Sequence, residues 1–136
     1  MVKATAAIVI EGGKVLIAKR KPTVKLANLW EFPGGKVEDG ETPEQCLIRE
    51  LREEFEIEVE VGEHLGTSVH EYDFGTIELM AFRTEVLDGE MKLNDHTEVA
   101  WVESEDLGRY KLAPAHIPFV DMITRGEIEL RFGDAL

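Results

Sequence analysis

The segment from residue 35 to residue 57, GKVEDGETPEQCLIRELREEFEI, constrains this 136-residue chain more than any other stretch. A glycine-led turn precedes a predicted helix in which Glu50, Glu53 and Glu54 stand at positions i, i+3 and i+4, so their carboxylates share one face. Like charges at this spacing destabilise an isolated helix, and a bound cation would offset their repulsion. Mg²⁺ and Mn²⁺ are hard cations that bind such oxygen ligands. A solvent-facing acidic helix is the alternative explanation for the triplet taken alone.

The spacing of the residues around that triplet carries a family resemblance. Gly35 is followed after five residues by Glu41, and Glu41 is followed after seven residues by Arg49-Glu50-Leu51 and then by Glu53-Glu54. This order resembles the signature of the Nudix hydrolase family, G-x5-E-x7-R-E-U-x-E-E-x-G-U, in which U is a bulky aliphatic residue. Glu56 stands where the family has glycine. This departure concerns the exit from the helix rather than the chemistry.

Composition narrows the classes of partner. A formal net charge of −13 argues against binding to a nucleic-acid polymer, which requires a basic surface, but it is compatible with a small polyphosphate that arrives with its metal. No apolar run has membrane-spanning length, so we expect no membrane partner. One cysteine, Cys46, cannot form an internal disulfide, and the expected compartment is the reducing cytoplasm. The length is that of a single domain, residues 1–136.

Hydrophobic periodicity and turn residues predict an α/β chain. We expect a helix from Pro43 to Glu56, because Thr42 is a good N-cap and proline suits the first helical position. The other expected elements are strands at residues 3–11, 14–20, 58–61, 66–72, 76–86 and 98–102, an extended segment at 29–32, helical segments at 104–107 and 117–125, and a final strand within 127–136. Strands on both sides of one helix indicate a mixed β-sheet with helices packed against it. This agrees with the α/β/α sandwich that the Nudix resemblance implies.

Residues 29–36, LWEFPGGK, resemble the segment that precedes the signature in the MutT branch of the family. The resemblance implies that Glu50, Glu53 and Glu54 bind Mg²⁺, or Mn²⁺, with the Gly34 carbonyl as an added ligand. It also implies that Lys36 and Arg20 neutralise phosphate oxygens. For Arg20, a solvated cation at the end of a strand is an equal alternative.

Arg49 is expected to orient the neighbouring carboxylates through a bidentate ion pair, a role in catalysis that does not require contact with substrate. Glu41 is expected to pair with Arg49 or with the start of the helix. Glu53 or Glu54 is the first choice for the group that activates water.

A carboxylate from a later loop is the second choice for that role. Residues 94–101, NDHTEVAW, resemble the E-H…W segment of the CTP-like members of the branch, which places Asp95 at the family's glutamate. Glu98 is a nearby substitute. His96 is expected to be a local hydrogen-bonding residue, because magnesium sites seldom include imidazole.

Two residues are candidates for contact with a nucleobase. Residues 112–118, LAPAHIP, resemble the L-A-P-A-D-I-P segment of the branch, in which the aspartate faces the base, and His116 stands at that position. An imidazole can donate and accept hydrogen bonds, so contact is implied but the base is not; a helix cap is the alternative. The resemblance also favours Phe32 for stacking on the base.

The predicted function is Mg²⁺-dependent hydrolysis of a nucleoside triphosphate, of the 8-oxo-dGTP or the CTP/dCTP type, to the monophosphate and pyrophosphate. One alternative is a hydrolase for a substrate linked to a nucleoside diphosphate, such as an NDP-sugar or ADP-ribose. Another is a non-catalytic Nudix-fold nucleotide-binding module, which the intact charges of the signature disfavour. The sequence indicates neither a monomer nor a homodimer.

Overall fold

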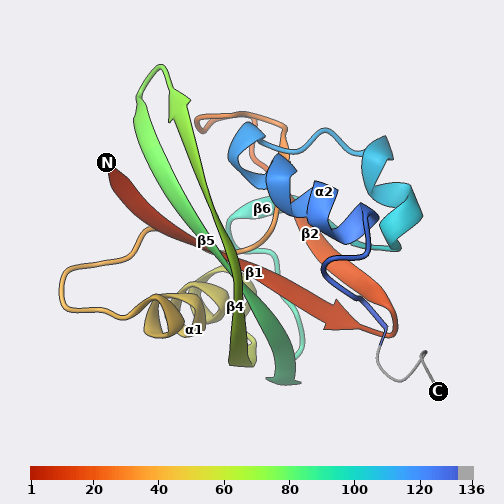
Figure 1. Ribbon diagram of the computed structural model, residues 1–136. Helices are drawn as coiled ribbons and strands as arrows, with labels where there is room; N and C mark the ends of the chain where they lie inside the picture. Colours follow the sequence, from red (N-terminus) through yellow and green to blue (C-terminus); the bar gives the residue numbers. More distant parts are fainter. Residues whose placement is uncertain (132–136) are drawn as a thin grey trace.

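A mixed β-sheet lies between two helical layers in the computed structural model, which describes residues 1–131 (Figure 1). The elements are β1 (Val2–Glu11), β2 (Lys14–Arg20), β3 (Trp30–Glu31), α1 (Pro43–Phe55), β4 (Glu58–Tyr72), β5 (Gly75–Asp88), β6 (His96–Val102), the 3₁₀ helices η1 (Ser104–Arg109) and η2 (Pro114–His116), and α2 (Ile117–Thr124). None of the helices within residues 1–131 is long and apolar enough to cross a membrane.

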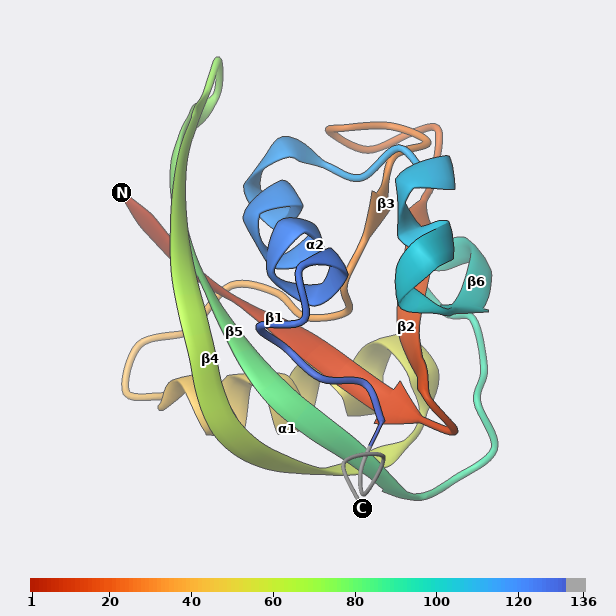
Figure 2. The ribbon, with the colours of Figure 1, turned by 45° about the vertical axis from the view of Figure 1, so that its right-hand side comes forward.

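The strands follow the order β3-β2-β1-β5-β4, and β6 also pairs with β2. The pairing of β1 with β5 is parallel, with Ala4 opposite Leu79, whereas the other strand pairs are antiparallel. This confirms the expected α/β class and mixed sheet. The β4–β5 hairpin extends beyond the body of the sheet, as the green strands of Figure 2 show.

Strand alternation divides the core into two clusters, one on each face of the sheet. In β1, Ala6 and Ile8 point to the face covered by α2, whereas Ala7 and Val9 point to the face covered by α1. The α1 layer buries Leu47, Leu51 and Phe55, and the α2 layer buries Phe119 and Ile123. Figures 1 and 2 show α1 and α2 on opposite sides of the strands.

A glycine-containing segment, residues 33–37, runs beside β1 where β1 and β2 diverge. The backbone N–H groups of Thr5 and Ala7 donate to the carbonyls of Gly35 (2.8 Å) and Pro33 (2.7 Å). Gly34 has a φ of 152°, and a Cβ at this position would lie 2.0 Å from the Thr5 carbonyl oxygen. Only glycine therefore permits this close approach.

Helix α1 begins where the sequence predicts. The Thr42 hydroxyl accepts a hydrogen bond from the Gln45 backbone N–H (3.1 Å), and the Gln45 side chain accepts from the Thr42 N–H (2.9 Å), forming a capping box. The helix ends at Phe55, one residue before the expected end, because Glu56 adopts a left-handed conformation with a φ of 56°. Glu56 therefore occupies, with a side chain, the C-terminal position that favours glycine.

The expected secondary structure differs from the observed one in three further places. Residues 58–72 form one strand rather than two, because pairing with β5 continues through irregularities between Val61 and Gly66. The segment expected at 104–107 is a 3₁₀ helix that extends to Arg109. Residues 127–131 form no strand, and the remainder of the expected final strand, residues 132–136, lies outside the described part of the chain.

Replacement of Glu56 by glycine is expected to raise the free energy of unfolding by about 1 kcal/mol, since glycine adopts a positive φ without a steric cost. Denaturant titration measures this gain. Glu56→Ala is the matched control, because it removes the carboxylate but keeps Cβ. Equal stabilisation by alanine and glycine would show that the carboxylate, and not the backbone conformation, is unfavourable.

Candidate functional site

A cavity of about 600 Å³ opens between residues 33–37, the loop after β2, the tip of the β4–β5 hairpin and η2. Its lining includes Arg20, Glu31, Phe32, Lys36, Glu54 and His116. Another hollow, of about 660 Å³, lies beside the β1–β2 turn and contains none of the site residues predicted from the sequence. The cavity at residues 33–37 is therefore the candidate site.

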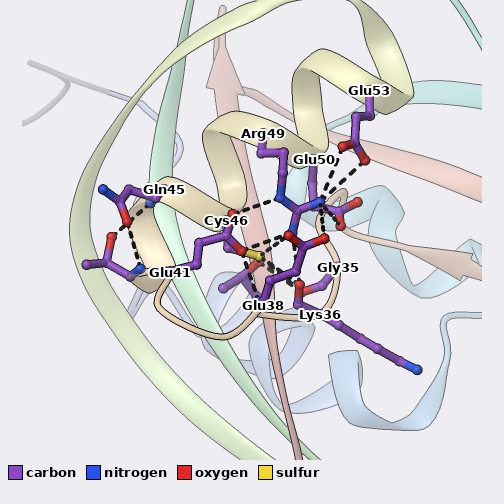
Figure 3. Close-up of polar contacts among 11 residues, drawn as sticks. Gly35, Lys36, Glu38, Glu41, Gln45, Cys46, Arg49, Glu50 and Glu53 are labelled. Atoms are coloured by element: carbon purple, nitrogen blue, oxygen red, sulfur yellow. Dashed lines mark hydrogen bonds and ion pairs between the residues drawn. The ribbon is translucent and has the colours of Figure 1, made fainter.

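Arg49 organises the acidic residues at the edge of this cavity. Its guanidinium forms a bidentate pair with Glu41 (Nε to Oε2 2.7 Å, Nη2 to Oε1 3.0 Å). The same group donates to Glu50 (2.9 Å), to Glu53 (3.3 Å) and to the Lys36 carbonyl (3.1 Å) (Figure 3). The hydrogen bonds from Arg49 lower the pKa of Glu41 to about 2, so this carboxylate stays ionised. These contacts fix the carboxylates of α1 relative to the glycine segment.

Glu50 packs directly against Gly35. A Cβ on Gly35 would lie 2.4 Å from the Glu50 carboxylate carbon, so the absence of a side chain at Gly35 provides the space for this carboxylate. Burial raises the pKa of Glu50, and the negative charges of Glu53 and Glu41 add to the shift, against the opposing effect of Arg49.

Glu54 is buried without a compensating charge. Only 8% of the residue is exposed, and its Oε1 atom has no hydrogen-bond partner among the described residues. Burial raises its pKa to about 9, and the negative charges of Glu31, Glu50 and Asp95 contribute further. A buried polar atom without a partner is unfavourable, and a cation at this position would remove both the charge repulsion and the missing contact.

The donor set fits a divalent cation with a preference for oxygen ligands. Glu50, Glu53 and Glu54 project from neighbouring turns of α1, and 58% of the Glu53 side chain is exposed. The carbonyls of Pro33 and Gly35 accept hydrogen bonds from β1, whereas no backbone hydrogen bond within residues 1–131 uses the Gly34 carbonyl between them. Gly34 therefore has a carbonyl oxygen available beside the carboxylates.

Glu31 was not predicted as a functional residue, yet it lies at the centre of the site. Arg20 donates to its Oε1 (2.9 Å), and the His96 Nε2 atom lies 2.8 Å from its Oε2. Burial alone would raise the pKa of Glu31, but the hydrogen bond with His96 and the charge of Arg20 lower it on balance. Ligand atoms of Glu31, Glu54 and His96 lie within 4.8 Å of one another. Glu31 therefore adds a further carboxylate to those of α1, and these carboxylates (Glu31, Glu50, Glu53 and Glu54) are called the acidic group below.

Arg20 and His96 each make a further contact that holds the side chain in position. Arg20 also donates from Nε to the Lys25 carbonyl (2.7 Å), so it holds the loop after β2 rather than standing free in solvent. The His96 ring stacks on Phe55 with a centroid distance of 5.3 Å. His96 thus forms a hydrogen bond, but with a residue 65 positions earlier in the chain rather than with the local partner that the sequence suggested.

The two loop carboxylates differ in their surroundings. Asp95 lies close enough to Glu54 for its charge to raise the pKa of that residue. Glu98 stands opposite Lys19 in the β2–β6 pairing and forms an ion pair with it at 3.8 Å. The structure therefore brings Asp95, rather than Glu98, toward the acidic group.

Part of the cavity lining is aromatic. Phe32 is only 1% exposed and packs in the core, while its backbone N–H donates to His116 Nδ1 (3.2 Å). The open aromatic surface belongs to Phe74, which is 43% exposed, stacks on Tyr72 (centroids 5.0 Å apart, planes at 7°) and carries Lys25 Nζ 4.5 Å above its ring.

Cys46 has a structural role. Its thiol is buried and contacts Thr5 Oγ1 (3.2 Å) and the carbonyl of Lys36 (3.3 Å). Burial raises the pKa of the thiol to about 11, which keeps it protonated and unreactive at neutral pH.

Without divalent cations, the free energy of unfolding is expected to fall as the pH rises from about 4.5 toward 9. The pKa of Glu54 is raised to about 9 in the folded chain from an ordinary value of 4.5, so the unfolded chain loses its proton first. Glu54→Gln should flatten this slope. Thermal melting of both proteins in EDTA across this pH range tests it; a difference between them that is constant with pH would contradict the assignment.

Sequence comparisons find relatives with named activities. The family model for the NUDIX domain matches residues 1–123. The chain is 40% identical over 121 residues to CTP pyrophosphohydrolase from Escherichia coli (strain K12), an alignment that covers 89% of this chain and 90% of the relative. It is 39% identical over 113 residues to a putative 8-oxo-dGTP diphosphatase 2 from Mycobacterium tuberculosis (strain ATCC 25618 / H37Rv), covering 81% of this chain and 79% of the relative.

Solved structures have the same fold. The solution structure of the E. coli ORF135 protein matches with a TM-score of 0.80 at 38% identity, covering 98% of this chain and 95% of that one. The crystal structure of a MutT protein from Methanosarcina mazei Go1 matches with a TM-score of 0.84 at 26% identity, covering 94% and 96%. The signature on α1, the matched domain and these relatives together place the chain in the Nudix hydrolase family, as a MutT-like member.

Proposed function

We propose that this protein hydrolyses a nucleoside triphosphate to the monophosphate and pyrophosphate, with a divalent cation as cofactor. The observation that carries the proposal is the buried carboxylate of Glu54, whose Oε1 atom has no hydrogen-bond partner among the described residues, in the wall of a cavity of about 600 Å³. Relatives named CTP pyrophosphohydrolase and 8-oxo-dGTP diphosphatase support the same substrate class.

The residues proposed to hold the cation are Glu50, Glu53 and Glu54, with the Gly34 carbonyl as an added ligand. Mg²⁺ suits such oxygen ligands, and Mn²⁺ would suit them too. The bound cation would neutralise phosphate oxygens and lower the pKa of a bound water. Arg49 acts as a positioning residue, because its guanidinium is already engaged by Glu41, Glu50 and the Lys36 carbonyl.

Lys36 and Arg20 are proposed to provide positive charge to the phosphates. The Lys36 side chain lines the cavity and extends away from the Arg49 contacts, so its ammonium group can meet a phosphate oxygen (Figure 3). Arg20 contributes its charge while it holds Glu31 and the loop after β2 in place. Positive charge fixed near a transferring phosphoryl group stabilises the charge that develops there.

Glu53 is the preferred group to accept the proton of the attacking water, because its carboxylate is the most exposed of the α1 triplet. Glu54 is the alternative on α1. Asp95 is the alternative from the loop before β6, and Glu98 the weaker one because Lys19 engages it. A carboxylate within hydrogen-bond reach of the water would contribute by general base catalysis.

The nucleobase is proposed to occupy the aromatic end of the cavity. His116 is the polar group there, and Phe32 orients it through the backbone N–H. One face of the exposed Phe74 ring stacks on Tyr72, and the other face, above which Lys25 Nζ lies, offers a surface for stacking when Lys25 moves aside. This arrangement leaves the acidic residues for the phosphate end of the same ligand.

Pyrophosphate release from CTP, UTP, dGTP and 8-oxo-dGTP, with ADP-ribose and UDP-glucose as non-triphosphate substrates, tests the proposal. We expect turnover of a triphosphate that requires Mg²⁺ or Mn²⁺, and we expect Glu53→Gln to lower kcat by orders of magnitude while the thermal melting temperature is retained. Wild-type binding of nucleotides without turnover would instead indicate a binding module. Near-normal activity of the variant would remove Glu53 from the cation site.

Gly35→Ala is expected to reduce cation-dependent turnover at least tenfold, because the added methyl group would displace the Glu50 carboxylate. The matched control is Gly108→Ala, where an added Cβ would meet no atom within 4 Å. Steady-state kinetics over a range of Mn²⁺ concentrations measures both. Equal activity of the two variants would show that the position of Glu50 is unimportant.

A further inference from the structure

The two ring nitrogens of His116 have different surroundings. Nδ1 lies 3.2 Å from the backbone N of Phe32, within a buried contact. A backbone N–H can only donate, so Nδ1 must accept and cannot carry a proton. The opposite ring orientation would place a carbon atom there and leave the buried N–H of Phe32 without a partner, which is unfavourable.

The proton of the neutral ring is therefore on Nε2. Burial lowers the pKa of His116 to about 4, so the ring is neutral at physiological pH. No hydrogen bond from Nε2 to another residue is found within residues 1–131. Glu31, the acidic residue whose charge acts on His116, already uses both carboxylate oxygens, one for Arg20 and one for His96. His116 thus presents one unused donor, and no acceptor, to the cavity that it lines.

We propose that His116 selects nucleobases that carry an exocyclic carbonyl, at C4 of a pyrimidine or C6 of a purine, over bases that carry an amino group there. The inference rests on the proposed function, which supplies the nucleotide. These exocyclic groups project away from the sugar, so they are suited to reach a residue in the cavity wall. A carbonyl accepts from Nε2–H, whereas an amino group would leave two buried donors facing each other.

Matched nucleotide pairs test the inference, since UTP and CTP, and ITP and ATP, carry a carbonyl or an amino group at this site. One unsatisfied buried donor corresponds to roughly a ten- to hundredfold preference, and kcat/KM should favour UTP and ITP by that factor. Equal rates within a pair, or faster cleavage of CTP and ATP, would overturn the proposal.

Binding of the monophosphates separates this inference from the proposed function. Isothermal titration with UMP, CMP, IMP and AMP requires no hydrolysis, so the preference for UMP and IMP should be measurable even if no triphosphate is cleaved. Absence of hydrolysis would then count against the proposed function alone. Equal affinity within each pair, or no binding of any of the four, would count against the role of His116.

Two isosteric variants provide the matched comparison. In His116→Asn the amide can accept from Phe32 N–H and still donate, so the preference for carbonyl bases should be retained. In His116→Asp both oxygens accept, so the preference should move toward CMP and AMP by at least tenfold. An unchanged preference in His116→Asp would show that the residue is structural.

The tautomer can be observed directly, which protects the test against variants that fail to fold. Long-range ¹H–¹⁵N correlation spectra of the wild-type protein should show His116 with Nε2 protonated and Nδ1 unprotonated. A spectrum with the proton on Nδ1 would overturn the proposal.

Discussion

The backbone pairing between β1 and residues 33–37 is the constraint on which the site depends. It requires a residue without a side chain at Gly34, because a Cβ there would lie 2.0 Å from the Thr5 carbonyl oxygen. The pairing holds Gly35 against the Glu50 carboxylate and leaves the Gly34 carbonyl without a backbone hydrogen bond in the described part of the chain. Through the preceding residue, Phe32, it also fixes the ring of His116. One short segment therefore connects the two ends of the cavity.

The carboxylates of the acidic group differ in how far their charges are compensated by neighbouring cations. Arg49 satisfies Glu41 and part of Glu50, so those carboxylates are compensated within the fold. Glu54 has no such partner and lies near the charges of Glu31 and Asp95, which raises its pKa. Burying it in this state opposes folding, and the cation proposed to bind here would remove that cost.

Local signals in the sequence predicted the parts of the fold that depend on local interactions. The Thr42-Pro43 start of α1 and its buried face, which includes Leu47 and Leu51, follow from capping and periodicity. The burial of Glu54 could not be predicted, because it depends on Glu31 and His96, which are 65 residues apart and meet only through the pairing of β2 with β3 and β6. The continuous β4 was missed since Gly62 and Gly66 resemble turn residues, whereas the pairing with β5 overrides them.

The buried thiol of Cys46 can report local opening of the structure around it. The sulfur is covered by Thr5 from β1 and by the carbonyls of residues 35 and 36, so an alkylating reagent can reach it only when these segments separate. The rate of alkylation thus reports how often the glycine segment opens. A ligand that bridges this segment and α1 would slow the reaction without touching the sulfur.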